Sequence, residues 1–230
     1  MHRRRAGLRW FAAGILAISA ANPALADVKG RAYGCYANLS NYGVPATTQC
    51  DSGWLDKVSG GSRSSYKSNV TYGNTLHVDY MESESHGDNC MGHSGSKLEA
   101  GWIMKGTPAE VTWMHMESAD EDTCCKPNDV DDRPSIFVGL TFGGQPVTVT
   151  GRQNQTLRIF GVATLILNEV KHDVDNDCDD DNSEHRALHL ILANGNEVML
   201  AVAKFDSDDD CCNTTPTHNS SWGAVKAIYR

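Results

Sequence analysis

The feature that most constrains the fold is an internal repeat that ends in paired cysteines. The sixteen residues Glu110–Cys125 align without a gap with Glu197–Cys212, at an offset of 87 residues. Cys90 and Cys178 lie at nearly the same offset, 88 residues. Each unit contains apolar runs, then acidic segments, then cysteine. Self-similarity at a fixed period is the signature of a repeated structural unit, so the sequence predicts two tandem units of about 87 residues.

The apolar runs in these units are short, rich in β-branched residues and bounded by Gly, Asn, Asp or Pro, as is typical of strands. Asn194-Gly195, between two such runs, is a strong hairpin signal. Helical spacing with capping residues does not occur after the first 26 residues. We expect strands over residues 76–80, 110–116, 136–142, 147–150, 157–167, 187–193 and 198–205. The prediction is an all-β fold, as a disulfide-stabilised sandwich or Greek-key arrangement.

The first 26 residues have the composition of a secretory signal peptide. A basic start precedes the apolar run 10–21, and Ala24-Leu25-Ala26 is a small-residue cleavage signal. The run is too short to span a bilayer, so a secreted or cell-surface protein is expected. After residues 1–26, we expect a Gly/Ser/Tyr-rich β segment at 27–74. The two repeats then occupy 75–150 and 151–230 and form one compact unit.

An even number of cysteines in an exported chain predicts disulfides, here four. Adjacent cysteines do not fit the usual C-x₂₋₄-C spacing of zinc sites, which makes a metal-thiolate site the weaker alternative. The eight residues are Cys35, Cys50, Cys90, Cys124, Cys125, Cys178, Cys211 and Cys212.

The repeat suggests how these cysteines pair. Cys35 and Cys50 enclose a polar loop outside the repeat and are expected to pair with each other. Cys90 would then bridge to Cys124 or Cys125, and Cys178 to one cysteine of the last doublet. The two cysteines left over would join the halves.

Charge narrows the classes of partner. Without residues 1–26 the formal charge is about −13, because four arginines leave with them. Such a charge repels phosphate backbones and anionic bilayers, so neither nucleic acid nor a membrane is expected as a partner. Calcium ions, another copy of the chain, and extracellular proteins or glycans are the partners that remain.

Most acidic residues lie in four segments beside the cysteines, at 82–90, 117–132, 173–184 and 206–210. Repulsion among these carboxylates favours a bound hard divalent cation. In the third segment, six acidic residues occupy positions 1, 3, 5, 7, 9 and 12 of a twelve-residue window, as in an EF-hand loop. Cys178 replaces the glycine of position 6, so the segment is not an EF-hand proper. The expected calcium ligands are Asp173, Asp175, Asp177, Asp179, Asp181, Glu184, Asp206, Asp208 and Asp210. The alternative is that these are solvated acidic turns.

Two other kinds of site receive less support. Imidazole and thioether groups together suit copper. Met114 and Met116 are expected on one strand face with His115 on the other, which scatters such ligands. The remaining candidates for copper are His86, Met91 and His93. The chain has no nucleophile elbow, zinc helix or phosphate-binding glycine loop, so no catalytic residue is expected.

Residues 157–212 resemble part of the choice-of-anchor P family of secreted bacterial proteins. The resemblance rests on Leu167-Asn168-Glu169, on Ala187-Leu188-His189-Leu190, and on the hairpin into Val198–Ala203 before a cysteine. It implies an exported, β-rich surface or matrix protein with no assigned reaction. Together these features predict a secreted calcium-binding structural or interaction protein, such as a matrix or filament subunit. A soluble lectin-like module or inhibitor is the alternative, and a hydrolase is less favoured.

Overall fold

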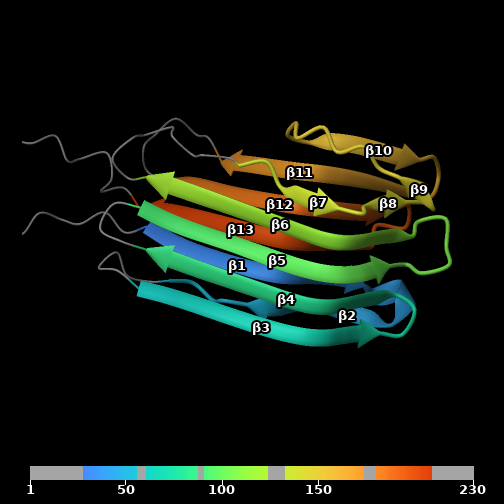
Figure 1. Cartoon of the computed structure of the whole chain (residues 1–230), viewed down its shortest axis with the longest axis horizontal. Helices are drawn as coiled ribbons and strands as arrows, with labels where there is room; N and C mark the ends of the chain where they lie inside the picture. The colour runs from blue at the N-terminus through green and yellow to red at the C-terminus, as the bar shows by residue number, and fades with distance from the viewer. Residues whose placement is uncertain (1–27, 56–60, 88–90, 124–132, 174–179, 209–230) are drawn as a thin grey trace, which may run out of the picture.

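A computed structural model describes residues 28–55, 61–87, 91–123, 133–173 and 180–208. Over these residues the chain forms two antiparallel β-sheets that lie face to face (Figure 1). Helical structure within the described part is limited to the 3₁₀ turn Ser40–Tyr42. The predicted all-β fold is confirmed, in the form of a sandwich.

Sheet A contains six strands, in the order β10-β11-β12-β13-β1-β2. Its central strands come from the second predicted repeat, and β1 extends the sheet by pairing with β13. The strands are β1 (Val28–Leu39), β2 (Val44–Asp51), β10 (Gln155–Ile159), β11 (Ala163–Asp173), β12 (Asp180–Leu192) and β13 (Glu197–Asp208).

Sheet B contains seven strands, in the order β3-β4-β5-β6-β8-β9, with β7 pairing to β6. Its long strands come mainly from the first predicted repeat. The strands are β3 (Gly61–Tyr72), β4 (Leu76–Gly87), β5 (Met91–Ile103), β6 (Val111–Thr123), β7 (Ile136–Val138), β8 (Thr141–Phe142) and β9 (Gln145–Pro146).

Each sheet contains a meander of three long strands. β4-β5-β6 and β11-β12-β13 are both three-stranded antiparallel meanders, with strand starts offset by about 87 residues. The sandwich packs these meanders against each other, and one apolar cluster contains residues from both sheets.

The acidic segments 82–90 and 117–132 lie between the expected apolar strands and are therefore predicted to be loops, but part of each is a strand. β4 continues to Gly87 and β6 to Thr123. In β4, Glu82 and Glu84 alternate with the fully buried Ser83 and Ser85. The loop prediction is therefore wrong here, because charged residues that alternate with inward-facing serines follow the two-residue period of a strand without any apolar residue.

Other expected elements differ in detail. The run 157–167 contains a turn at Phe160–Val162 between β10 and β11, and 147–150 is not a strand. β5 was not expected. The hairpin at Asn194-Gly195 is confirmed: it joins β12 to β13, and Gly195 has φ 80°, a conformation in which glycine carries no steric penalty.

Strand pairing in sheet A is interrupted along one row that crosses five strands. The row contains Asn168, Ala187, Ala201, Gly34 and Cys50, and three of them have positive φ: Asn168 (55°), Ala201 (47°) and Cys50 (56°). On β11, β12 and β13, two successive residues face inward at this row, so side-chain alternation changes phase across it. Residues three apart, on either side of the row, therefore share a face.

Candidate functional site

The six cysteines of the predicted repeats belong to segments outside the described residues, and the strand ends that border these segments lie at one end of the sandwich. The strands next to these segments all end there, on the left of Figure 1. The pairs at their ends are Gly87 with Gly92, Met91 with Thr123, Asp173 with Asn182, and Asp180 with Asp208. We call this the cysteine end, and the opposite end, with the Asn194-Gly195 turn, the hairpin end.

Part of the predicted calcium set borders the cysteine end. Asp173 closes β11, Asp181 lies in β12, and Asp206 and Asp208 lie in β13. Pairing of Asp206 with Asn182 and of Asp181 with Ser207 sets the third and fourth acidic segments beside each other. Residues 180–184 belong to a strand, so the window 173–184 is not one continuous curled loop. Asp175, Asp177, Asp179 and Asp210 lie outside the described residues.

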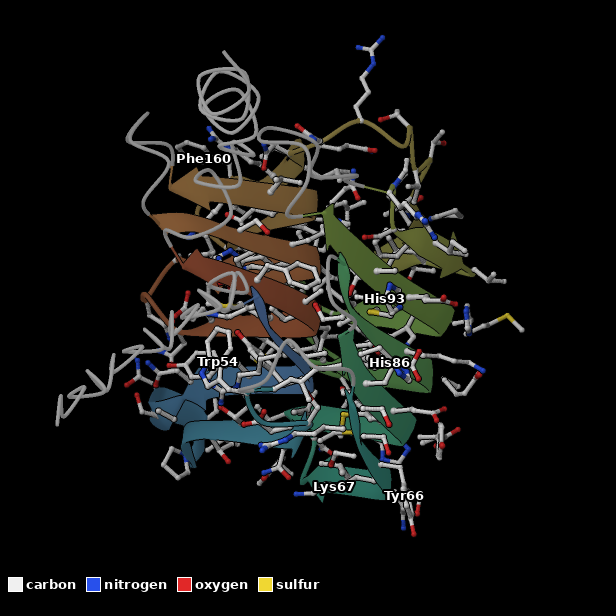
Figure 2. The ribbon with its side chains drawn as sticks, turned by 90° about the vertical axis from the view of Figure 1, so that its left-hand side faces the viewer. Trp54, Tyr66, Lys67, His86, His93 and Phe160 are labelled. Atoms are coloured by element: carbon white, nitrogen blue, oxygen red, sulfur yellow. The ribbon has the colours of Figure 1, made fainter. Side chains whose placement is uncertain are left out.

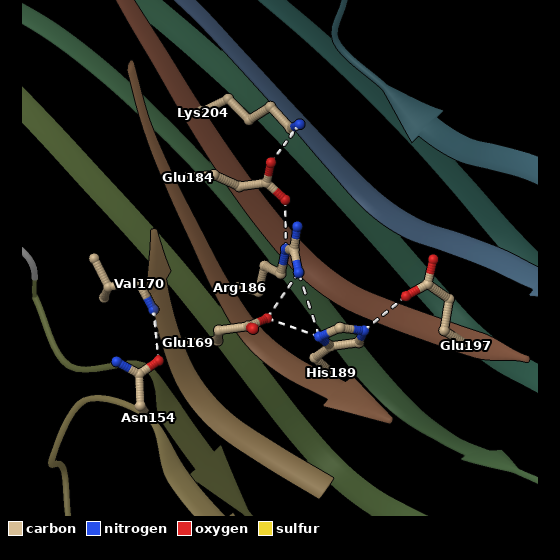
Figure 3. Close-up of polar contacts among 8 residues, drawn as sticks. All are labelled: Asn154, Glu169, Val170, Glu184, Arg186, His189, Glu197 and Lys204. Carbon is tan, nitrogen blue, oxygen red and sulfur yellow. Dashed lines mark hydrogen bonds and ion pairs between the residues drawn. The ribbon is translucent and has the colours of Figure 1, made fainter. Parts of the chain in front are cut away.

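Glu184, expected as the last calcium ligand, belongs instead to an ion-pair network on the outer face of sheet A (Figure 3). Its carboxylate accepts a hydrogen bond from Arg186 Nε and pairs with Lys204 Nζ at 2.5 Å. Both oxygens are engaged within the sheet, so Glu184 is not a free ligand.

Arg186 and His189 continue this network, which we call the sheet A network. Arg186 Nη1 donates to Glu169 Oε2 at 2.8 Å. His189 Nδ1 lies 2.8 Å from the same Glu169 oxygen, and its Nε2 lies 2.9 Å from Glu197 Oε2. Both ring nitrogens of His189 therefore lie beside carboxylate oxygens, which only accept hydrogen bonds. The network joins the carboxylates of Glu169, Glu184 and Glu197 to Arg186, Lys204 and His189.

Burial makes these contacts strong. The side chains of Arg186, His189 and Glu169 are 7%, 6% and 11% exposed. Burial alone would raise the pKa of Glu169, but His189 and Arg186 outweigh it and lower that pKa to about 2. Burial acts on the Glu184 carboxyl in the same sense, and Arg186 and Lys204 outweigh it to lower its pKa. The carboxylates of Glu169 and Glu184 are ionised and paired, so they support the sheet and offer no proton donor for acid catalysis.

Sequence reasoning missed the sheet A network, although one signal for it exists. Glu184 and Arg186 are two apart, as expected for neighbours on one strand face. Arg186 and His189 are three apart, which normally places them on opposite faces. The interruption at Ala187 brings them together, and nothing in the local sequence marks it.

The interior near the cysteine end is polar. Serines of β4, β5 and β6 are buried there, and Ser83 Oγ lies 2.9 Å from Ser96 Oγ. The fully buried His185 links the two sheets, with Nδ1 3.3 Å from the Ala119 carbonyl and Nε2 2.8 Å from Asn168 Oδ1. These hydrogen bonds fix how the two sheets pack in a region where the interior side chains are mostly polar.

The structure does not contain the expected Cys35–Cys50 disulfide. Both residues are buried as free thiols on neighbouring strands, and Cys50 Sγ lies 3.2 Å from the Ser65 carbonyl oxygen. Burial raises the pKa of Cys35 to about 12. These thiols are therefore protonated and unreactive in the folded state. The other six cysteines lie outside the described residues.

The expected faces of the copper candidates need a correction. Met114 is 64% exposed whereas Met116 is fully buried, so the two thioethers do not share a face. Pairing between β5 and β6 skips Met114, which changes the phase of alternation there. Among the described residues, no three or more His, Cys, Asp or Glu side chains already converge as metal ligands.

Two pockets lie at the hairpin end, with volumes of about 250 and 310 Å³. Both include Gly161, Val162, Leu192 and Ala193, and their linings contain no carboxylate, histidine or cysteine.

No helix among the described residues is long and apolar enough to cross a membrane. Searches of family models, of curated proteins and of solved structures gave no match to this chain.

Proposed function

We propose that this chain is a secreted structural or interaction protein whose cysteine end binds calcium and is cross-linked by disulfides. The observation that carries the proposal is the common position of the strand ends that border all four acidic, cysteine-containing segments. A meander sends alternate connections to opposite ends, and here every repeat segment with cysteine belongs to the same end. The resemblance of residues 157–212 to exported surface proteins agrees with this role.

Strand register supports the disulfide part of the proposal. Met91 pairs with Thr123, and Cys90 and Cys124 are the residues next to that pair along the chain. In the same way, Cys178 precedes β12 and Cys211 follows β13, whose ends pair at Asp180 and Asp208. We therefore propose links from Cys90 to the first doublet and from Cys178 to the second. Cys35 and Cys50 are not part of this set.

Strand pairing supports the calcium part, because it places aspartates of the third and fourth acidic segments on the adjacent strands β12 and β13. Hard oxygen ligands from several short segments suit Ca²⁺, which accepts six to eight of them in flexible geometry. The proposed ligands are the aspartates of 173–181 and 206–210, without Glu184, whose oxygens are held by Arg186 and Lys204.

The test is thermal unfolding and sizing of the oxidised secreted chain in Ca²⁺, in Mg²⁺ and in chelator. Binding of Ca²⁺ to the folded state alone should raise Tm, and about 100-fold excess over Kd corresponds to roughly 2.7 kcal/mol. The rise should disappear in Asp175→Ala and in Asp177→Ala. Asp79→Ala, a half-exposed carboxylate in β4, is the matched control and should keep it. Equal Tm in all three media would overturn the calcium proposal, and peptide mapping of the same sample tests the disulfides.

A further inference from the structure

The outer face of the β4-β5 hairpin brings two histidines and a carboxylate together near the cysteine end. His86 and His93 are directly paired across the two strands, with ring centroids 6.3 Å apart (Figure 2). Glu84, two residues before His86, shares their face. Its Oε2 lies 3.3 Å from His86 Nε2, and its Oε1 lies 3.9 Å from His93 Nε2. We call these three residues the His–Glu–His cluster.

We propose that the His–Glu–His cluster binds a borderline divalent transition-metal ion, Zn²⁺ being the one tested, with water completing the coordination. Imidazole nitrogen and carboxylate oxygen are ligands of Zn²⁺ at about 2.0–2.2 Å. Ligands at that distance around a tetrahedral ion are about 3.3–3.5 Å apart. Glu84 Oε2 is already that close to His86 Nε2, and the other oxygen, Oε1, is slightly farther from His93 Nε2.

To bring His86, Glu84 and His93 within ligand distance of one ion, their side chains must rotate, but the backbone does not have to move. The side chains of His86, Glu84 and His93 are 52%, 46% and 33% exposed, so they can change rotamer at little cost. The backbone beneath is fixed, because continuous pairing from Met81 to Gly87 with β5 holds the two strands in register. A metal ion would therefore select one arrangement of three mobile side chains on a rigid support.

Charge on the same face favours a cation. Glu82 and Glu117 lie on the strands beside Lys97, and Glu99 follows Lys97 on the same face. The site differs chemically from the proposed calcium site, because two of its three ligands are nitrogen. Thioether ligands play no part, since Met114 lies across the interruption and Met116 points inward.

β4 contains its own matched control. His77 and Asp79 have the same two-residue spacing, and His77 Nε2 lies 2.7 Å from Asp79 Oδ1. Across the strand, however, His77 faces Trp102, whose ring stacks on it at 5.6 Å, where a second ligand would have to lie. This pair offers a histidine and a carboxylate without the second histidine.

The test is calorimetric titration of ZnCl₂ into the oxidised, calcium-saturated secreted chain. We expect one dominant 1:1 site, weakened at least about tenfold in His86→Ala and in His93→Ala, because loss even of outer-shell partners of a metal costs that much. His77→Ala should bind as the wild type does. In parallel, the ring nitrogen NMR signals of His86 and His93 should shift with Zn²⁺ while that of His77 stays in place.

Unchanged Zn²⁺ affinity in His86→Ala and His93→Ala, or ring signals that do not respond, would overturn the proposal. The variants are informative because these half-exposed side chains contribute little to folding, which metal-free thermal unfolding verifies. The outcome is independent of the calcium proposal. Asp175→Ala should leave Zn²⁺ binding intact, and His93→Ala should leave the calcium-dependent rise in Tm intact.

Discussion

The outer faces of the two meanders carry similar side chains in different surroundings. On β11-β12-β13, carboxylates, an arginine, a lysine and a histidine form the sheet A network, with its central side chains almost fully buried. On β4-β5-β6, carboxylates, a lysine and histidines also lie in neighbouring rows, but about a third to a half of each side chain is exposed. Because the side chains of the sheet A network are shielded from water, their ion pairs stabilise the fold. The side chains on the outer face of β4-β5-β6 are accessible to water, so they can exchange partners.

The largest loss of stability is expected when the central cation of the sheet A network, Arg186, is removed. Arg186→Ala leaves Glu169 and Glu184 buried with one cationic partner fewer, which should cost about 3–5 kcal/mol. Lys97→Ala, which breaks the 3.1 Å pair with Glu99 on sheet B, should leave stability unchanged within error. Urea unfolding at pH 7 measures both. Similar losses in the two variants would show that burial does not distinguish the faces.

Acid should act on the buried face more strongly than on the exposed one. Glu169 has a pKa of about 2 in the folded state against an ordinary 4.5, so the fold favours its ionised form. That contribution, roughly 3 kcal/mol from the size of the shift, is complete above about pH 4.5 and is lost as the pH falls towards 2. Unfolding measured between pH 2.5 and 7 should show a shallower loss in Glu169→Gln.

Glu99→Gln is the control on sheet B for this pH dependence. A hydrogen bond from Lys97 lowers the pKa of Glu99 too, with a smaller contribution from His115. Because Glu99 is exposed, solvent screens the pairing and the variant should follow the wild-type curve. A wild-type slope that survives Glu169→Gln would place the acid-sensitive group elsewhere.

The strands that sequence reasoning found are those with apolar inner faces. In β6, β11 and β13, apolar residues either alternate with polar ones or form continuous runs, and Asn194-Gly195 marks one turn clearly. β5 was missed because its inner face near the cysteine end is Ser94 and Ser96, which provide no hydrophobic period. The fold buries them by pairing hydroxyls with each other and with backbone carbonyls.

The sheet A network was missed for a different physical reason. Its assembly depends on the row of interrupted pairing, which includes Ala201 in a left-handed conformation. Alanine is disfavoured in that region by about 1–2 kcal/mol, so no local preference predicts it. The neighbouring strands impose the conformation, and only the folded sheets reveal which charged residues then share a face.

Two asparagines with nearly the same φ, one buried in sheet A and one exposed in sheet B, allow the two sheets to be compared at single residues. Asn168 in sheet A has φ 55° and Asn69 in sheet B has φ 53°. Asn168 is buried, and its Oδ1 accepts from the Ser135 amide at 2.8 Å and lies 2.8 Å from His185 Nε2, whereas Asn69 is exposed. Asn69→Ala should cost about 1 kcal/mol for the left-handed backbone alone. Asn168→Ala should cost about 3 kcal/mol, because buried donors also lose their acceptor.

Glycine separates the two contributions, since it adopts positive φ without steric penalty. Asn69→Gly should therefore be close to wild type. Asn168→Gly should still lose about 2 kcal/mol, because the Ser135 amide and His185 remain without the Asn168 oxygen. Urea unfolding of the four variants measures the difference. Equal stability of the two glycine variants would mean that Asn168 is required only for its backbone, and that the polar interior of the cysteine end contributes no more to stability than the exposed face of sheet B.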